Sequence, residues 1–433
     1  MSDGARKGKG CNNNIFIVNG IIHDVMKSKK KTPVLMQIYD YSQMFDSINL
    51  EQALSDVYDA GLKDNTLALL YQANKKISMA VNTPSGLSER QILENIVLQG
   101  DTWGSILASV QVDSIGKECE EAGFGYKYKD SLSVSMLGLV DDTIGITEAG
   151  YKAQQMNAFL NVKTAEKGLQ FGVSKCKSML IAKDSENVLN SQLEVDSWKV
   201  EHKDNPETAE IELIETFVGL VPIDQTDEQK YLGFVISSKS NNMANINQIK
   251  KKSIGTIRQV LNRLESLNLQ KYYFECSIIF LNTMIRSSIL YACEVYYDLK
   301  EIEIRRIERI EEGFLRQLFK TTKGCPISQL YLEVGQVPAR FEITKMRLLF
   351  LQYILKQSEE SMIQKFLFLQ FQQPTKGDWG SACLGDLKDL NISNTLEEIK
   401  LMTKQKFKKI LQEKIEIKAY LYLTAKQGKR KGN

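Results

Sequence analysis

The sequence predicts an α+β fold, in which an antiparallel sheet backed by helices is followed by an all-helical region. Residues 34–39 are nearly all apolar, as expected for a strand covered on both faces. The two strand-like halves of 132–146 meet at Asp141-Asp142, and a two-residue acidic turn suits an antiparallel hairpin. From Asn245 onward the apolar residues recur with helical spacing.

The elements of the first 240 residues follow from the spacing of apolar residues. Ile15, Val18 and Ile22 share one helical face, for example, and Gly61 separates two helical segments. Residues 184–230 are polar and charged and predict only short strand-like stretches, such as 198–201. We expect helices at about 15–26, 50–60, 65–73, 105–120 and 153–169, and strands at 34–39, 76–81, 132–140, 143–146, within 170–182 and at 231–237.

The second half of the chain predicts helices only. Ile246, Ile249, Ile257 and Val260 lie on one stripe, and basic residues fall mostly off it. Further helices are expected at about 271–291, 301–320, 340–356 and 396–414. The change of pattern places a domain boundary near residue 240, which gives domains 1–240 and 241–433.

Composition excludes several classes of protein. At 433 residues the chain is too long for one hydrophobic core. Its seven Cys are scattered and its two His are too few for His-based catalysis or a His metal site, which indicates an intracellular protein with reduced thiols. We find neither a signal peptide nor an uninterrupted apolar run of about 18 residues, so we expect no membrane span and a location in the cytoplasm or nucleus.

Carboxylates stand at two predicted strand ends about a hundred residues apart in the sequence. Asp40 follows the first strand, and Asp141 and Asp142 occupy the hairpin. Carboxylate oxygens are ligands that Mg²⁺ prefers. Two such cations about 4 Å apart can activate a hydroxyl group and stabilise a pyrophosphate leaving group. Taken singly, each motif has a simpler interpretation, because Asp is common in turns and at strand ends.

The order of these motifs resembles the reverse transcriptase family, closest to the reverse transcriptases of non-LTR retrotransposons. The resemblance rests on Asp40, on Asp141-Asp142, and on three further segments: Gln99-Gly100, Gly168 to Lys177, and Tyr231-Leu232-Gly233. It implies a right-hand polymerase with partial fingers and a palm in 1–240 and a helical thumb and connection in 241–433. The implied activity is RNA-directed DNA synthesis, with Mg²⁺ or Mn²⁺ bound by Asp40, Asp141 and Asp142. The partners would be an RNA template, a DNA primer and deoxynucleoside triphosphates.

The resemblance also assigns nucleotide contacts. Phe45, five positions after Asp40, would stack under the sugar and exclude a 2′-hydroxyl; the alternative is a core Phe. Gln99 and Gly100 would contact the incoming nucleotide, although the adjacent Asp101 departs from the family pattern. The alternative for these two residues is a turn that starts a helix.

Lys175 is the candidate general acid for the leaving pyrophosphate, and its alternative is a solvated Lys on an alternating strand. Tyr231, Leu232 and Gly233 resemble the primer grip. Leu139 and Val140 replace the aromatic residue and Ala that the family usually has before the Asp pair.

Basic residues in two places are candidates for contacts with phosphates. Arg6 and Lys7, with Lys9, resemble the nucleotide-facing part of the fingers. Lys250, Lys251 and Lys252 lie on the first helix of the thumb-like region. For this lysine run, the alternative is a solvated helix face.

Three functional hypotheses follow. The first is an active reverse transcriptase. The second is an inactive retrotransposon-derived remnant that still binds nucleic acid, because we expect the chain to be a fragment with truncated fingers and no endonuclease domain. The third is another two-metal enzyme, such as a nucleotide cyclase, which the helical thumb and the Gln99-Gly100 segment disfavour.

Overall fold

The computed structural model describes residues 10–27, 32–94, 97, 102–183, 193–204, 211–267, 272–322 and 324–428. It divides into two compact units. The first unit contains residues 1–14 and 28–232, and the second contains residues 15–27 and 233–433. Helix α1 (Cys11–Lys27) contributes to both units.

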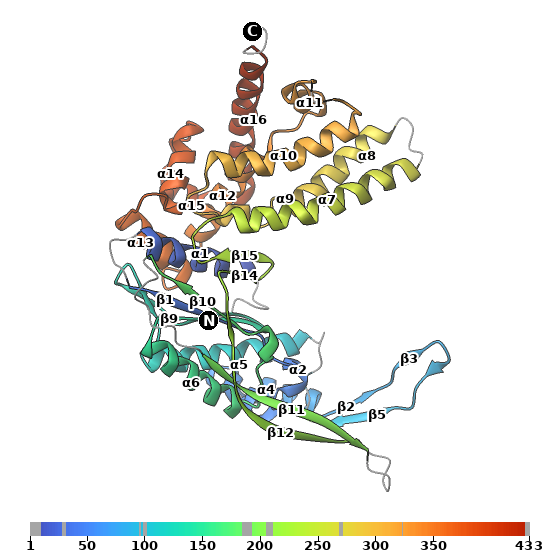
Figure 1. Ribbon diagram of the computed structural model, residues 1–433, viewed down its shortest axis with the longest axis vertical. Helices are drawn as coiled ribbons and strands as arrows, with labels where there is room; N and C mark the ends of the chain where they lie inside the picture. Colours follow the sequence, from blue (N-terminus) through green and yellow to red (C-terminus); the bar gives the residue numbers. More distant parts are fainter. Residues whose placement is uncertain are drawn as a thin grey trace. The chain divides into compact units, whose positions relative to one another are not determined.

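The first unit is built on a five-stranded sheet of order β13-β10-β1-β9-β8 (Figure 1). Strand β1 (Val34–Tyr39) lies at its centre, and all six of its residues are buried, as its apolar sequence predicts. It pairs antiparallel with β10 (Lys177–Ile181) on one side and with β9 (Asp142–Glu148) on the other. Strand β8 (Met136–Leu139) pairs antiparallel with β9. The short strand β13 (Asp224–Gln225) is parallel to β10.

Helices α5 (Thr102–Glu121) and α6 (Tyr151–Glu166) lie along one face of this sheet (Figure 1). Their buried residues, including Leu107, Ile115 and Met156, join the hydrophobic core of the first unit. The α+β class expected from the sequence is therefore what the structure has.

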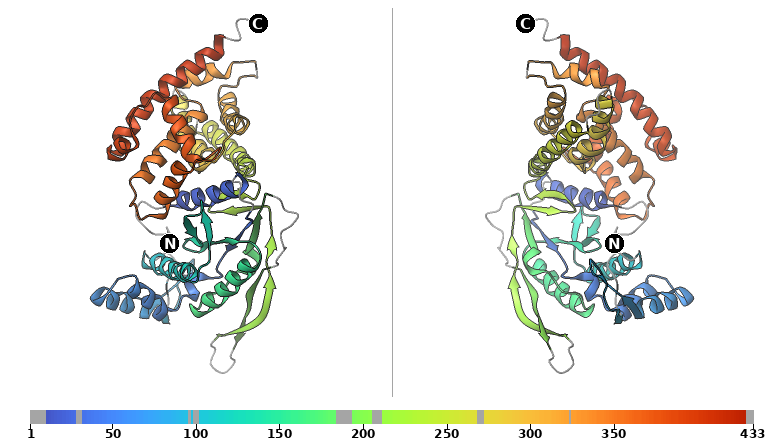
Figure 2. Two further views of the ribbon diagram at one scale, coloured as in Figure 1. Left: turned by 90° about the vertical axis from the view of Figure 1, so that its left-hand side faces the viewer. Right: turned by 90° about the vertical axis from the view of Figure 1, so that its right-hand side faces the viewer.

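The first unit has further helices and further antiparallel strand pairs. They are the helices α2 (Met44–Ser47), α3 (Leu50–Asp59) and α4 (Asp64–Lys75), and the antiparallel pairs β2 (Lys76–Met79) with β5 (Gln91–Glu94), β3 (Asn82–Thr83) with β4 (Gly86–Leu87), β6 (Tyr126–Tyr128) with β7 (Leu132–Val134), and β11 (Glu194–Asp204) with β12 (Ile211–Pro222). The pair β11–β12 forms a long two-stranded ribbon (Figure 2). The expectation of only short strand-like stretches in 184–230 was wrong. Neither strand of the ribbon has the unbroken alternation of apolar and polar residues by which strands are recognised in a sequence.

The second unit is helical apart from strand β15 (Phe234–Ser237). Its helices are α7 (Met243–Ser266), α8 (Tyr273–Phe280), the π-helical turn η4 (Leu281–Ile285), α9 (Arg286–Ile289), the 3₁₀ turn η5 (Cys293–Val295), α10 (Glu301–Leu318), α11 (Ile327–Val334), α12 (Ala339–Leu355), α13 (Met362–Gln372), α14 (Trp379–Asp389), α15 (Leu396–Leu401) and α16 (Lys404–Gly428).

Phe16 of α1 lies in an aromatic cluster of the second unit. Its ring centroid is 5.0 Å from that of Trp379 and 5.6 Å from that of Phe366, both edge-to-face. Residues 15–27 therefore belong to the core of this unit, although the whole of the sheet lies between them and Gly233 in the sequence. The expected helix at 15–26 is confirmed, but its place in the second unit is not visible from sequence.

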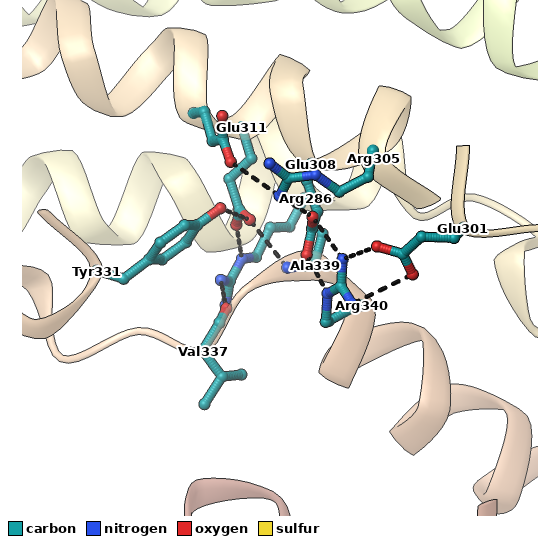
Figure 3. A network of polar contacts seen from close by, with 10 residues as sticks. Arg286, Glu301, Arg305, Glu308, Glu311, Tyr331, Val337, Ala339 and Arg340 are labelled. Atoms are coloured by element: carbon teal, nitrogen blue, oxygen red, sulfur yellow. Dashed lines mark hydrogen bonds and ion pairs between the residues drawn. The ribbon is translucent and has the colours of Figure 1, made fainter. Parts of the chain in front are cut away.

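A buried polar network joins four helices of the second unit (Figure 3). Arg286 of α9 donates from Nε to Glu311 Oε1 of α10 at 2.7 Å. The other oxygen of Glu311 accepts from the Tyr331 hydroxyl at 2.7 Å and from the Ala339 amide at 3.1 Å. The side chain of Glu311 is fully buried, so these bonds satisfy a charge that would otherwise be costly to bury.

Two of the elements expected from the sequence are divided in the structure. The strand expected at 231–237 is a hairpin, in which β14 (Glu228–Tyr231) turns through Leu232 and Gly233 into β15. The helix expected at 271–291 is divided by the π-helical turn η4. Within the described residues, Tyr273–Val295 is also the one segment long and apolar enough to span a membrane by length and composition, with a mean hydropathy of 1.4. Its residues Leu281, Ile285 and Ile289 are fully buried in the second unit, and this packing accounts for their apolarity.

Candidate active site

The strand register brings the candidate carboxylates to one end of the sheet. In the β1–β9 pair Tyr39 lies opposite Thr143, so Asp40 emerges beside the beginning of β9. In the β8–β9 pair Leu139 lies opposite Asp142. Antiparallel pairing therefore places Asp40, Asp141 and Asp142 close together, although about a hundred residues separate the first from the other two.

The turn that carries Asp141 differs from expectation by one residue. Because Leu139 pairs with Asp142, the two turn residues are Val140 and Asp141, and Asp142 is already the first residue of β9. Val140 has a φ of 58°, a conformation that is strained for a β-branched residue. Asp141 is exposed in this turn and Asp142 is half-buried. Strain of this kind is concentrated at functional sites.

The three carboxylates influence one another. The pKa of Asp142 is raised, first by burial and then by the negative charges of Asp141 and Asp40. Lys230 and Lys175 act in the opposite direction. A site with mutually repelling carboxylates and oxygen donors only is chemically suited to a hard divalent cation such as Mg²⁺. In the described part of the chain, no three acidic, His or Cys side chains are drawn together into a closed metal-binding cluster.

One Asp40 oxygen is bonded to Lys175. The distance from Lys175 Nζ to Asp40 Oδ1 is 2.9 Å. This hydrogen bond is the main reason that the pKa of Lys175 is raised, and Asp141 and Asp142 contribute further. The side chain of Lys175 is 69% exposed. Lys175 stands in a 3₁₀ turn (η1, Val173–Lys175) before β10, rather than on an alternating strand.

Gly172 and Cys176 hold the backbone around Asp40, and sequence reasoning gave neither a role. The amide of Gly172 donates to the Asp40 carbonyl oxygen at 2.8 Å. A Cβ at Gly172 would lie 3.2 Å from Asp40 Oδ1, so glycine lets this segment approach the carboxylate closely. Burial raises the pKa of the Cys176 thiol to about 11, which leaves it unreactive. Both residues lie inside the segment from Gly168 to Lys177. Their proximity to Lys175 in the sequence is the feature that could have indicated a role beside Asp40.

Phe45 lies in α2 and is half-buried against the hydrophobic core of the first unit. Part of its ring thus serves packing and part is accessible. Of the other nucleotide-binding candidates, Gln99, Gly100, Arg6 and Lys7 lie outside the described residues.

The primer-grip candidates form a two-residue hairpin turn. Leu232 has a φ of 49° and Gly233 a φ of 81°, both in the left-handed region that a tight hairpin turn requires. Tyr231 is buried, and its hydroxyl accepts a hydrogen bond from Asn14 Nδ2 at 3.5 Å. Asn14 also donates to the Gly138 carbonyl of β8 at 3.0 Å, so Tyr231 is linked to the strand that leads into the Asp141 turn.

Lys250, Lys251 and Lys252 are exposed on α7 of the second unit. Exposure fits both contacts with phosphates and a solvated helix face.

A search of curated proteins found no match. Among solved structures, apo telomerase from Candida tropicalis shares 10% sequence identity with a TM-score of 0.38, over 92% of this chain and 55% of that chain. Telomerase from Candida albicans, solved in complex with a TWJ fragment of telomeric RNA, shares 11% identity with a TM-score of 0.35, over 92% and 52%. The chain thus spans about half the length of these telomerase chains.

One protein family matches a large part of this chain. The family model described as reverse transcriptase (RNA-dependent DNA polymerase) matches residues 2–236. This match covers more than half of the chain and includes the Asp40, Asp141-Asp142 and Tyr231 segments. The chain therefore belongs to the reverse transcriptase family, the family of RNA-directed DNA polymerases.

Proposed function

We propose that this protein is the reverse transcriptase of a non-LTR retrotransposon, which extends a DNA primer on an RNA template by two-metal nucleotidyl transfer. The observation that carries the catalytic part is the strand register. It brings Asp40 from the end of β1 beside Asp142 at the start of β9, with Asp141 in the adjoining turn. These are the three carboxylates that the family resemblance assigns to metal binding.

Asp40, Asp141 and Asp142 would hold the ions through their carboxylate oxygens. When bound, Mg²⁺ or Mn²⁺ would activate the primer hydroxyl and stabilise the leaving pyrophosphate. The chain itself contributes the position of these oxygens, which is fixed by the β1–β9 pairing and by the tight turn at Val140. Repulsion within the carboxylate group is relieved by a bound cation, which favours metal binding at this end of the sheet.

Lys175 would donate a proton to the pyrophosphate as it leaves. Its raised pKa keeps the side chain charged at neutral pH, as a proton donor must be before transfer. Its exposed position beside Asp40 leaves room for it to move from the carboxylate to a phosphate oxygen.

The remaining candidates would orient substrates. Phe45 would contact the sugar of the incoming deoxynucleoside triphosphate, together with Gln99, Gly100, Arg6 and Lys7. Tyr231, Leu232 and Gly233 would hold the primer end, because the paired left-handed residues make a rigid turn. Lys250, Lys251 and Lys252 would contact phosphates of the template–primer duplex.

Primer extension tests the proposal. The full chain is incubated with a DNA primer on an RNA template, deoxynucleoside triphosphates, and Mg²⁺ or Mn²⁺. We expect extension by the wild type and none by Asp141→Asn/Asp142→Asn, which preserves shape and removes charge. Asp59→Asn is the matched control, because Asp59 is exposed at the end of α3.

Absence of extension by folded wild type that still binds the hybrid would overturn the proposal in favour of an inactive nucleic-acid-binding protein. The retrotransposon origin is tested separately. Dispersed copies of the coding sequence in its genome would support that origin, and a single-copy gene would count against it.

A further inference from the structure

A groove runs between α7 and α10 of the second unit, which lie side by side in Figure 1. Its volume is about 420 Å³, within the roughly 300–1,000 Å³ typical of ligand sites. One face of each helix lines it, because the lining residues recur at helical spacing. They are Ile246, Asn247, Lys250, Ile254 and Ile257 of α7, and Arg306, Arg309, Ile310, Gly313 and Gln317 of α10.

The groove carries three cations and no carboxylate. Lys250, Arg306 and Arg309 are all exposed, and none of them forms an ion pair with any residue in the described part of the chain. Not every arginine of α10 is unpaired. Arg305, for example, lies 2.7 Å from Glu308, and Arg316 donates to the carbonyl oxygens of Thr322 and Cys325. Arg306 and Arg309 therefore place unpaired positive charge on the groove side of α10, where it attracts an anionic ligand.

The floor of the groove is apolar. Ile246, Ile257 and Ile310 are buried, and Ile254 is 42% exposed. The amide side chains of Asn247 and Gln317 complete the lining. An apolar floor beside cations and amides matches the chemistry of a nucleotide. Its base offers a flat face to isoleucine side chains and hydrogen-bonding edges to amides, and its phosphate is anionic.

Gly313 keeps the groove open. A Cβ added there would meet nothing within 4 Å, and the residue lies inside the 18-residue helix α10. Glycine at such a position costs about 1 kcal/mol relative to alanine. No positive φ requires glycine here. The missing side chain instead leaves space next to Ile310 and Arg309.

We propose that the α7–α10 groove binds one unpaired nucleotide of a single-stranded nucleic acid, with its base on the isoleucine floor and its phosphate on Arg306 and Arg309. A base pair within a duplex is stacked and cannot enter a groove of this size. The inference rests on the proposed function only in naming the RNA template as the strand concerned. It adds a contact for unpaired template, made by residues other than those of the Asp40 site.

Filling the groove tests the proposal. Binding of the full chain to a labelled, unstructured RNA and to a fully paired RNA–DNA hybrid is measured by fluorescence anisotropy. Gly313→Leu should weaken binding to the single strand about tenfold, equivalent to about 1.4 kcal/mol, and leave hybrid binding unchanged. Gly255→Leu is the matched control. It makes the same substitution in α7, also meets nothing within 4 Å of its Cβ, and does not line the groove.

Two results would overturn the proposal. One is equal single-strand affinity of Gly313→Leu and Gly255→Leu. The other is an equal reduction of single-strand and hybrid binding in Gly313→Leu, which would assign the groove to the duplex backbone. Unlabelled single-stranded DNA and adenosine monophosphate serve as competitors. Displacement by micromolar monophosphate would reassign the groove to a free nucleotide, and displacement only by the strands supports the proposal.

The interaction with phosphate has its own test. In Arg306→Gln/Arg309→Gln, the salt dependence of single-strand binding should decrease in slope by about 0.7 for each phosphate that the arginines neutralise in the wild type. An unchanged slope would show that Arg306 and Arg309 do not contact phosphate. Asp141→Asn/Asp142→Asn should bind the single strand as wild type does. If no variant extends a primer but Gly313→Leu still weakens single-strand binding, the proposed function fails and the groove proposal stands. The two proposals can therefore be tested separately.

Discussion

Lys175 Nζ donates a hydrogen bond of 2.9 Å to Asp40 Oδ1, although 135 positions separate the two residues in the sequence. The lysine thus occupies a carboxylate oxygen that a divalent cation would need. An ammonium group and a metal ion cannot both be bonded closely to this oxygen, because like charges repel. Metal binding and the Lys175–Asp40 pair are expected to compete.

Removal of the lysine charge should therefore strengthen metal binding. Lys175→Met is expected to bind Mn²⁺ about two- to fivefold more tightly, a modest effect because exposed ion pairs are weak. Mn²⁺ binding is measured by titration calorimetry without nucleotide. Lys177→Met is the control, because Lys177 pairs with Asp224 at 2.6 Å instead. Unchanged or weaker Mn²⁺ binding in Lys175→Met would show that the pair does not compete with the ion.

The accessible part of Phe45 leads to a prediction about sugar selection. Phe45→Val should let the enzyme incorporate ribonucleotides, because a smaller side chain leaves space for a 2′-hydroxyl. Its half-buried position against the core predicts a loss of stability as well, of about 1 kcal/mol. Incorporation of deoxynucleotides and ribonucleotides is compared on one template at a temperature where the variant is folded. Unchanged discrimination would assign Phe45 to the core alone.

Glu294 makes the stability of the second unit dependent on pH. Burial raises its pKa to about 7 from 4.5, so the folded state binds a proton that the unfolded state releases between these values. Stability contributed by this group is therefore complete below about pH 4.5 and falls as pH rises toward 7. A shift of this size corresponds to about 3 kcal/mol.

Glu294→Gln is expected to remove this dependence and to be more stable than wild type at pH 8. Urea unfolding at pH 5 and pH 8 measures the difference. Glu275→Gln, an exposed position in α8, should leave the wild-type dependence in place. If Glu294→Gln loses stability by the same amount at both pH values, the charge of Glu294 has no part in the effect.

The sequence predicted those elements whose local pattern agrees with their environment. Val34 to Tyr39 is nearly all apolar because both faces of β1 are covered. Helix α7 shows its buried stripe directly, with Ile246, Ile249 and Ile257 inside. The ribbon β11–β12 was missed because neither strand shows an unbroken apolar alternation in the sequence, and its register depends on how two separate segments pair.

The candidate site was predicted only in part, for a related reason. Residue types and order pointed to Asp40, Asp141 and Asp142, but the turn position depends on which residue of β8 faces Asp142. The sequence does not predict this register, because it requires a positive φ at Val140. A β-branched residue rarely adopts that conformation, so Val140 is not expected in the turn. The Lys175–Asp40 bond likewise depends on a pairing between segments far apart in the chain.

The Arg286–Glu311 pair offers the sharpest test of stability. Both side chains are buried, and Glu311 has bonds to Arg286, Tyr331 and the Ala339 amide from α9, α11 and α12 (Figure 3). Glu311→Ala would leave the buried Arg286 guanidinium without its hydrogen-bonded carboxylate, and the next carboxylate, Glu342, is 4.0 Å away. Removal of one partner of such a pair typically costs about 3–5 kcal/mol, so we expect a decrease of this size in the free energy of unfolding, measured in urea.

Glu301→Ala is the matched control on the same helix, since Glu301 is 66% exposed and also pairs with an arginine, Arg340. An exposed pair contributes about 0–1 kcal/mol, so this variant should unfold at nearly the wild-type urea concentration. Equal effects of the two substitutions would mean that burial of Arg286 is relieved by water or by movement of α9. In that case the network does not hold these helices together, and the apolar packing around it does.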